Sequence, residues 1–233
     1  MKTVIELKNF KKNFGSKVVH KDVNFKVYEG ECLGLIGGSG SGKSVILRSL
    51  IGLEKPDSGS IIIEGEDIAR YNEAQLISIR KKMAYVFQNG ALFDSLTVFD
   101  NLAYPLREHF HLSESEIHTK ILFQLKEFGL EGNEYIYPGS LSGGMQKRVG
   151  LARSMMMSPR FVLYDEPTAG LDPFNTKRIQ ELIIEMKKKG VTSILVTHDM
   201  PTAFRVCDRM IILQKGQIVE DDKYIQEFAE GET

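Results

Sequence analysis

The sequence lacks a net charge of either sign, because 30 lysine and arginine residues are balanced by 31 aspartate and glutamate residues, which leaves a formal charge of -1. This balance excludes a broad basic surface for nucleic acid or for an anionic membrane, so any anion site must be local. Long apolar runs are also lacking, since the longest are strand-sized and fall short of the roughly 20 residues that a membrane-spanning helix needs. The N-terminus has no apolar segment followed by a small-residue cleavage site. We therefore expect neither a membrane span nor a secretory signal peptide.

Cysteines, internal repeats and linker-like segments are scarce or lacking as well. The two cysteines, Cys32 and Cys207, belong to separate strand or helix patterns and have no CxxC spacing, which argues against a disulfide or a metal site. We expect both to be small buried hydrophobic residues. A length of 233 residues with 42% hydrophobic and 26% charged residues fits one large globular α/β domain or two very small ones. Because no linker divides the chain, we expect one domain over residues 1–233.

The strand and helix patterns of the chain fall into three parts. Runs rich in β-branched and aromatic residues at 4–10 and 18–28 predict a small antiparallel sheet, and a short apolar run then ends in a glycine-rich loop before a helical pattern. Helical patterns dominate from residue 96 to residue 157, and we interpret them as a helical subdomain inserted at about residues 89–158. Strands alternate with helices after it, as in a parallel sheet, and Asp172 is a candidate N-cap for the longest of these helices.

The glycine-rich loop matches the pattern GxxxxGK[ST] between a predicted strand and a predicted helix. Its residues are Gly37, Gly38, Ser39, Gly40, Ser41, Gly42, Lys43 and Ser44. Positions without side chains let backbone amides close around the α- and β-phosphates of a nucleotide. Lys43 can reach the β and γ oxygens, and the Ser44 hydroxyl can bind Mg²⁺. The loop both matches the motif and lies between a predicted strand and a predicted helix. We therefore interpret it as a phosphate site rather than a simple turn.

Two adjacent carboxylates, Asp165 and Glu166, follow an apolar run at residues 161–164. The carboxyl end of a parallel strand is the edge at which α/β sheets bind ligands, and the phosphate loop lies at the same edge. Asp165 is suited to holding Mg²⁺ through its water shell, and Glu166 to polarising an attacking water. A pair that only caps a loop is the structural alternative.

Three further features carry weaker signals on their own. Gln88 and His198 each follow a predicted strand at the same edge, where an amide can touch Mg²⁺ or water and an imidazole can contact a γ-phosphate. A lone residue of either type is more often structural. A second glycine-rich segment, Leu141-Ser142-Gly143-Gly144-Met145, opens a helical pattern and so offers a second anion site.

Together these motifs resemble the ATP-binding subunits of ABC transporters, and the similarity extends from about residue 4 to residue 217. GGSGSGKS is similar to Walker A, FVLYDE to Walker B and LSGGM to the signature, while Gln88, Asp172 and His198 match the Q-loop, the D-loop and the switch position. The resemblance implies a P-loop NTPase with a RecA-like α/β core, an N-terminal antiparallel β subdomain and an inserted helical subdomain. It also implies an ATPase that uses ATP and Mg²⁺.

The resemblance further implies a role for each site residue. The family forms head-to-tail dimers, in which Ser142, Gly143 and Gly144 of one copy would contact the γ-phosphate held by Walker A of the other. Phe14 matches the aromatic position that stacks on adenine, with a core aromatic of a strand as the alternative. The implied catalytic residues are Glu166, His198, Lys43 and Gln88, the Mg²⁺-binding residues are Ser44, Gln88 and Asp165, and the remaining nucleotide-binding residues are the Walker A loop and Asp172.

Two departures and one long segment point to a subfamily. Met145 stands where the signature usually has glutamine, with Gln146 next, and the D-loop reads AGLD. Segment 87–108 resembles the ATPases of Mla-type phospholipid transporters, which work with an integral MlaE-like permease and an MCE-domain substrate-binding protein. We therefore expect lipid transport at the cytoplasmic face of the inner membrane, with these partners, a small accessory subunit and no nucleic acid. A cell-division ATPase and an ABC transporter for another substrate are the alternatives.

The segment after Gln88 is also unusually apolar. If its side chains are exposed, they form a docking surface, and if they are buried, they form the core of the helical insertion. The sequence leaves both interpretations open for each residue. Our hypothesis is that Phe93 and Phe99 help to dock the permease.

Overall fold

The computed structural model describes residues 1–219, so residues 220–233 of the expected domain lie outside the described residues. The strands are β1 (Thr3–Phe14), β2 (Lys17–Tyr28), β3 (Cys32–Ile36), β4 (Ser58–Ile63), β5 (Glu66–Asp67), β6 (Met83–Val86), β7 (Phe161–Asp165), β8 (Thr192–Thr197), β9 (Arg209–Gln214) and β10 (Gln217–Val219). The helices are α1 (Lys43–Leu50), α2 (Glu73–Arg80), α3 (Val98–His109), α4 (Glu114–Glu127), the 3-10 helix η1 (Pro138–Ser140), α5 (Gly143–Met155), α6 (Pro173–Lys188) and α7 (Met200–Val206). Within the described part of the chain, none of these helices combines the length and the apolar character needed to cross a membrane.

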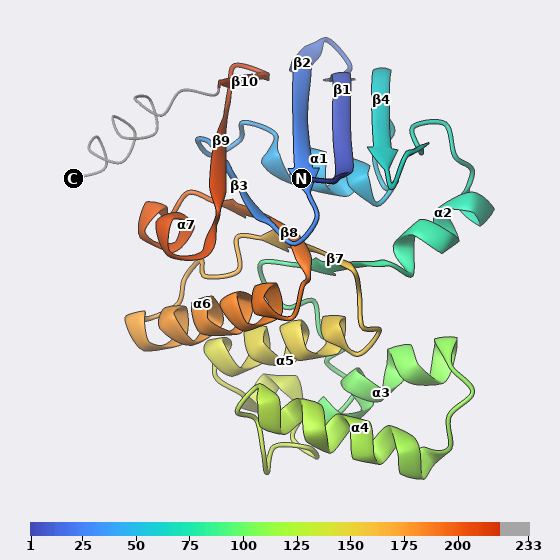
Figure 1. Cartoon of the computed structure of the whole chain (residues 1–233). Helices are drawn as coiled ribbons and strands as arrows, with labels where there is room; N and C mark the ends of the chain where they lie inside the picture. The colour runs from blue at the N-terminus through green and yellow to red at the C-terminus, as the bar shows by residue number, and fades with distance from the viewer. Residues whose placement is uncertain (220–233) are drawn as a thin grey trace.

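The strands form one mixed sheet in the order β5-β4-β1-β2-β10-β9-β3-β8-β7-β6 (Figure 1). Its N-terminal part is antiparallel, as the sequence predicts, because β1 pairs with β2 on one side and with β4 on the other. Both strands of the β1–β2 hairpin are longer than expected, and only Gly15 and Ser16 connect them. Gly15 has a φ of 59°, which glycine adopts at little steric cost, so the chain can reverse within two residues.

The core of the sheet is parallel, and its strands end at one edge. β3 lies between β8 and β9, and β7 lies between β6 and β8, all in parallel pairing. Every side chain of β3 and β8 is buried, as expected for strands that are covered on both faces. The segments that leave the carboxyl ends of β3, β6, β7 and β8 therefore converge, and they carry Gly37, Gln88, Glu166 and His198.

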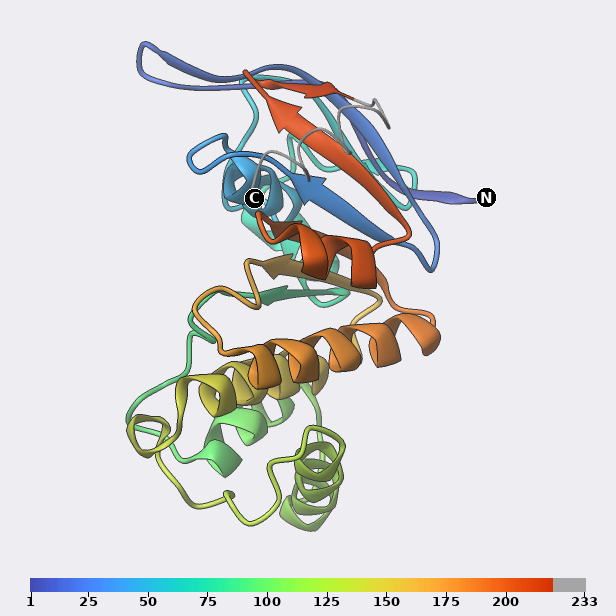
Figure 2. The same cartoon turned by 90° about the vertical axis from the view of Figure 1, so that its left-hand side faces the viewer.

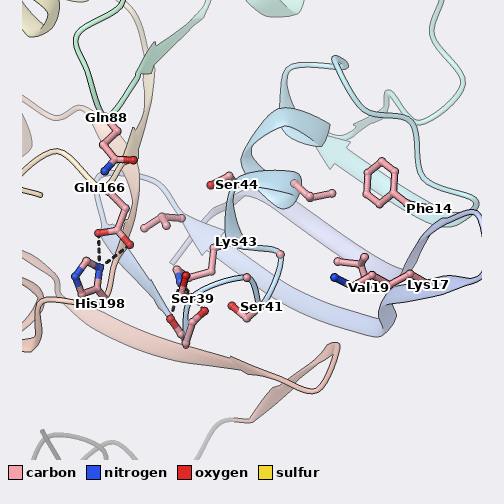
Figure 3. A pocket seen from close by; sticks show the side chains of 16 residues that line it. Phe14, Lys17, Val19, Ser39, Ser41, Lys43, Ser44, Gln88, Glu166 and His198 are labelled. Carbon is pink, nitrogen blue, oxygen red and sulfur yellow. Dashed lines mark hydrogen bonds and ion pairs between the residues drawn. The ribbon is translucent and has the colours of Figure 1, made fainter.

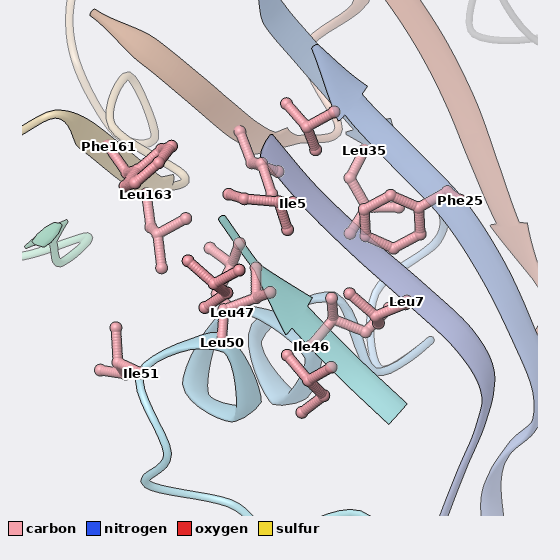
Figure 4. Packing of buried hydrophobic residues seen from close by; sticks show 14 of the residues in the cluster. Ile5, Leu7, Phe25, Leu35, Ile46, Leu47, Leu50, Ile51, Phe161 and Leu163 are labelled. Carbon is pink, nitrogen blue, oxygen red and sulfur yellow. The ribbon is translucent and has the colours of Figure 1, made fainter. Parts of the chain in front are cut away.

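Two apolar clusters cover the two faces of the sheet. The first joins β1, β2 and β4 to α1 and to one face of the parallel strands, and Figure 4 shows Leu7, Phe25 and Leu47 within it. The second lies between the opposite face and the helices α3, α4, α5 and α6 (Figures 1 and 2). On β7, Leu163 belongs to the first cluster and Tyr164 to the second. Successive side chains of a strand therefore point to opposite faces here, as strand geometry requires.

A buried asparagine joins α3 to the segment that follows β6. The side-chain amide of Asn101 donates hydrogen bonds to the carbonyl groups of Phe93, Leu96 and Thr97. Its side-chain oxygen accepts a hydrogen bond from the backbone N–H of Phe93. A fully buried amide with this many partners fixes the backbone around it, so this segment has a defined conformation.

Polar N-cap residues mark the first turns of α5 and α6. The Asp172 carboxylate accepts hydrogen bonds from the backbone N–H groups of Phe174 and Asn175, so the predicted N-cap of α6 is confirmed. Helix α5 begins one residue later than expected. Ser142 has an extended backbone, and its hydroxyl accepts a hydrogen bond from the N–H of Met145.

The two cysteines lie closer together than their separate patterns suggest. The Sγ atoms of Cys32 and Cys207 are 4.0 Å apart, because β3 and β9 are neighbours in the sheet. Both thiols are free, as expected. Cys32 is buried, but Cys207 is partly exposed, so the expectation of two buried residues is correct only for Cys32.

A buried histidine lies directly beneath the glycine-rich loop. His20 of β2 is fully buried, and its ring packs edge-on against Phe10, with 5.3 Å between the ring centroids. A Cβ atom at Gly42 would lie 2.6 Å from the Nε2 atom of His20. Burial lowers the pKa of His20 to about 4, against a smaller opposing effect of the Gly42 backbone.

This histidine makes the stability of the fold depend on pH. Between the ordinary pKa of 6.5 and the lowered value of about 4, the folded state binds fewer protons than the unfolded chain. The free energy of unfolding therefore falls as the pH falls through that range, and His20 should account for about 2–3 kcal/mol between pH 7 and pH 4.5. Urea unfolding of the wild type and of His20→Leu at both pH values measures this difference. Equal losses of stability in the two proteins would contradict it.

Candidate functional site

A cavity of about 830 Å³ opens at the carboxyl edge of the parallel strands, which is enough room for a nucleotide. The glycine-rich loop forms one side of it (Figure 3). The other predicted site residues that line it are Phe14, Gln88, Glu166 and His198. These residues come from distant parts of the sequence, so the sheet assembles most of the predicted site in one place.

The glycine-rich loop leaves the start of α1 open to an anion. Gly42 has a φ of 102°, and the contact with His20 leaves no space for a side chain at this position. No side chain caps the N-terminus of α1, so its first N–H groups are available to a phosphate.

Lys43 lies folded over this loop with only 7% of its surface exposed. Its Nζ atom donates hydrogen bonds to the carbonyl oxygens of Gly37, at 2.5 Å, and Gly38, at 3.1 Å. Burial lowers the pKa of Lys43, while the nearby carboxylates of Glu166 and Asp165 raise it and so favour the charged form. The amine is thus held at the cavity with its charge close to the loop, where an anionic group can replace the carbonyl oxygens as its partner.

Oxygen ligands that suit Mg²⁺ gather beside Lys43. The Ser44 hydroxyl donates a hydrogen bond to Oδ1 of Asp165 at 2.9 Å, and Gln88 lines the same cavity. Within residues 1–219, no group of three or more histidine, cysteine or acidic side chains is arranged for a metal. A site with few protein oxygens fits Mg²⁺, which keeps several waters and binds substrate phosphates. The roles of Ser44, Gln88 and Asp165 at this metal stay predictions.

Tyr85 belongs to this site, and sequence reasoning missed it. Its hydroxyl donates a hydrogen bond to Oδ2 of Asp165 at 2.7 Å. Burial and the nearby carboxylate both raise the pKa of Tyr85. The phenol therefore stays protonated and acts as a hydrogen-bond donor to Asp165. The only signal in the sequence is that residues 83–87 form a strand that could pair with the strand before Asp165.

Glu166 and His198 form a contact pair at the cavity (Figure 3). Nδ1 of His198 lies 3.0 Å from both carboxylate oxygens of Glu166. The backbone of Glu166 is left-handed, with a φ of 51°, and its N–H donates to the carbonyl of Val196 in the neighbouring strand. Such a conformation is unfavourable for a residue with a side chain, so the fold holds Glu166 in place against local strain.

Phe14 lines the cavity on the side away from Glu166 and His198 (Figure 3). Phe14 is 44% exposed, and the Lys12 Nζ atom lies 4.9 Å from its ring centroid. An aromatic side chain of the sheet core would be buried, so this exposure favours a ring that offers its face to a ligand. Stacking on adenine stays a prediction.

The signature segment is not part of this cavity. Ser142 and Gly143 are exposed, whereas Gly144 is buried, and a Cβ atom on Gly144 would lie 2.4 Å from the Asn175 side chain. The Asn175 side chain also donates a hydrogen bond to the Asp172 carboxylate at 2.5 Å. The D-loop carboxylate therefore makes its hydrogen bonds to the first turn of α6. One chain therefore carries the two predicted phosphate sites at separate places.

The residues after Met145 supply the polar contacts that a methionine cannot make. Met145 packs against the second apolar cluster, and the amide of Gln146 donates hydrogen bonds to the carbonyls of Pro138 and Leu141 at 2.8 and 3.3 Å. Lys147 donates a hydrogen bond to the carbonyl of Ala169, which ties α5 to the D-loop. Sequence reasoning missed both contacts, because their partners lie in loops that no local pattern identifies.

Comparison with known proteins agrees with this geometry. The family model described as "ABC transporter" matches residues 20–169, which is more than half of the chain. The chain is 40% identical over 242 residues to the probable ribonucleotide transport ATP-binding protein mkl of Mycobacterium leprae, with 99% of this chain and 70% of that protein covered. It is 42% identical over 232 residues to the methionine import ATP-binding protein MetN of Protochlamydia amoebophila, with 97% and 68% covered. The chain thus spans about two thirds of the length of these relatives.

Solved structures show the same fold. CbiO1 of Clostridium perfringens, part of the ABC transporter complex cbiONQ, has a TM-score of 0.88 and 30% identity, with 100% of this chain and 93% of that chain covered. The ATP-binding cassette MJ0796, in a dimeric post-hydrolysis state bound to ADP and Pi, has a TM-score of 0.85 and 33% identity, with 93% and 97% covered. These neighbours confirm the predicted P-loop NTPase fold with its α/β core. We conclude that the chain belongs to the ABC transporter family, as one of the ATP-binding subunits that hydrolyse ATP with Mg²⁺.

Proposed function

We propose that two copies of this chain, each a single nucleotide-binding domain, hold ATP between them and that hydrolysis drives a membrane permease. The observation that carries this proposal is the separation of the two glycine-rich segments, since Walker A lines the cavity whereas Ser142 and Gly143 are exposed elsewhere. A second copy, placed head to tail, would bring its signature to the γ-phosphate. The dimeric state of the MJ0796 cassette supports this arrangement.

Within each site, the loop amides and Lys43 bind the phosphates of ATP, and Phe14 stacks on adenine. Ser44, Asp165 and Gln88 would hold Mg²⁺, which supplies positive charge to the phosphate oxygens when it is bound. Binding of ATP draws the two copies together, and hydrolysis releases them, so the cycle moves whatever is attached to the helical side of each copy.

Glu166 is the general base of the proposed reaction. Its carboxylate is only 16% exposed and lies at the cavity, where it can accept the proton of the attacking water. His198 is 61% exposed and contacts Glu166 through Nδ1. Nδ1–H can therefore orient the carboxylate, and the sensing role that we assign to His198, donation from Nε2–H to the γ-phosphate, requires a ring with a proton on both nitrogens.

The finer proposal is transport of lipid with an MCE-type system, at the cytoplasmic face of the inner membrane. Its support is the resemblance of segment 87–108 and of LSGGM to Mla-type ATPases, together with an exposed aromatic surface on that segment. This surface, here called the post-Gln88 surface, consists of Phe93 and Tyr104, which are 45% and 47% exposed. The Phe93 and Tyr104 rings lie 5.1 Å apart between centroids. An MlaE-like permease could bury this patch.

Phe93 and Phe99, both expected to contact the permease, lie in different environments, because Phe93 is exposed and Phe99 is partly buried. Phe99 is partly buried and packs against the second cluster, and its ring centroid lies 5.6 Å from that of His118 and 6.4 Å from that of Tyr135. It therefore stabilises the helical part of the chain, and we propose docking only for the post-Gln88 surface.

The relatives favour other substrates as alternatives, because one is named for ribonucleotide transport and another for methionine import. A cell-division ATPase is a third candidate. Purification of the complex encoded around this gene discriminates between them. An MCE-domain protein together with a permease supports the lipid proposal, and a permease that copurifies without an MCE-domain protein counts against it.

Phe93→Asp should weaken the complex with the permease on the order of 30-fold, because a charge in the centre of an aromatic contact costs about 2 kcal/mol or more. Copurification with the permease, followed by a binding titration, measures the effect. Phe204→Asp is a matched control, because Phe204 lies on α7 and is 52% exposed. If both variants bind the permease as tightly as the wild type, the post-Gln88 surface is not the docking site.

A further inference from the structure

We propose that Tyr85 is a positioning residue that fixes the Asp165 carboxylate and thereby sets the metal affinity of the site. The two oxygens of Asp165 each have one donor, Ser44 at Oδ1 and Tyr85 at Oδ2, at 2.9 and 2.7 Å. With a donor on each side, the carboxylate plane cannot rotate without loss of a hydrogen bond. Hydrogen bonds to an ionised acceptor are roughly twice as strong as those between neutral groups, so the two donors together hold one orientation of the carboxylate.

The sheet register explains why Tyr85 reaches this carboxylate. β6 and β7 are parallel, with Tyr85 opposite Leu163. Asp165 follows Leu163 by two residues and therefore lies on the same face of the sheet. The Tyr85 ring packs against the first apolar cluster, so its hydroxyl is held at the edge where β7 ends.

The same ring also contacts the residue before Gln88. The rings of Tyr85 and Phe87 are 4.3 Å apart between centroids, and Phe87 directly precedes Gln88. Tyr85 thus touches the segment that presents Gln88 on one side and Asp165 on the other. Tyr85 therefore contacts Asp165 directly and contacts the segment that presents Gln88 through Phe87.

Tyr85→Phe tests the proposal, because it removes the hydroxyl and keeps the ring. Mn²⁺, which can replace Mg²⁺ and is detected by electron paramagnetic resonance, is titrated into the chain with a non-hydrolysable ATP analogue. We expect Mn²⁺ to bind about 10–100-fold more weakly, which is typical of the loss of a group that orients a metal ligand. The affinity for the analogue in EDTA should stay unchanged. Unchanged Mn²⁺ affinity, or an equal loss of nucleotide affinity with and without metal, would overturn the proposal.

Two further variants make the result specific. Tyr164→Phe is a matched control, because the Tyr164 hydroxyl is buried on the opposite face and has no hydrogen-bond partner among residues 1–219. Its Mn²⁺ affinity should equal that of the wild type, and a loss as large as that of Tyr85→Phe would overturn the proposal. The inference rests on the magnesium role proposed for Asp165, which Asp165→Asn tests separately. If Asp165→Asn weakens Mn²⁺ binding and Tyr85→Phe does not, only the role of Tyr85 fails.

Discussion

Glu166→Gln is expected to lower the rate of ATP hydrolysis on the order of 10²–10⁴-fold and to leave ATP-driven association of two chains intact. The amide has nearly the shape of the carboxylate but cannot accept the proton of the attacking water. Binding of ATP depends instead on the loop amides and on Lys43, whose Nζ atom lies within 3.1 Å of the Gly37 and Gly38 carbonyl oxygens. Steady-state phosphate release measures the first effect, and gel filtration with ATP measures the second.

A surface carboxylate provides the control for this experiment. Glu185 lies on α6 and does not line the cavity, so Glu185→Gln should hydrolyse ATP at the wild-type rate. Near-normal turnover in Glu166→Gln would remove Glu166 as the general base. Loss of ATP-driven association in the same variant would show that its carboxylate serves binding rather than catalysis.

Lys43→Ala is expected to weaken ATP binding about 10–100-fold, because charge-assisted hydrogen bonds to a phosphate are lost at about 1.5–3 kcal/mol. Hydrolysis should fall further, by about 10²–10³-fold at saturating ATP, since the same charge stabilises the transition state. Titration calorimetry with ATP separates the loss of affinity from the loss of rate.

Lys147 is the matched control for Lys43. In both lysines burial lowers the pKa of the amine, and the nearby Glu166 carboxylate opposes this shift. Lys147 does not line the cavity and donates to the Ala169 carbonyl instead, so Lys147→Ala should bind ATP with unchanged affinity. Unchanged ATP affinity in Lys43→Ala would show that the phosphates bind elsewhere.

Four of the expected site residues lie at the cavity because a local sequence pattern places each of them there. Gly37, Gln88, Glu166 and His198 each follow an apolar strand, and parallel strands bring such ends to one edge. Tyr85 has no such signal, because its role depends on the register of β6 against β7, which are far apart in the sequence. The same reason hides the contact of Lys147 with the D-loop.

Exposure is the second quantity that local patterns do not determine. Phe93 and Phe99 are equally apolar and only six positions apart, yet one is 45% exposed and the other packs into the second cluster. The difference comes from α4 and the loop after it, which supply His118 and Tyr135 to cover Phe99. A hydrophobic pattern alone therefore predicts that these side chains are removed from water. It does not show whether the core of the same chain or a partner protein covers them.

The central proposal is that each ATP site is shared by two copies, and mixing two inactive variants tests it most directly. Lys43→Ala damages Walker A. Gly143→Glu damages the signature, where a side chain has open space within its own chain and would meet only the second copy. Neither variant alone should hydrolyse ATP appreciably, but a mixed dimer contains one site with an intact Walker A and an intact signature. Mixing the two variants should therefore restore ATP hydrolysis. A mixture no more active than its components, or wild-type activity in Gly143→Glu alone, would contradict it.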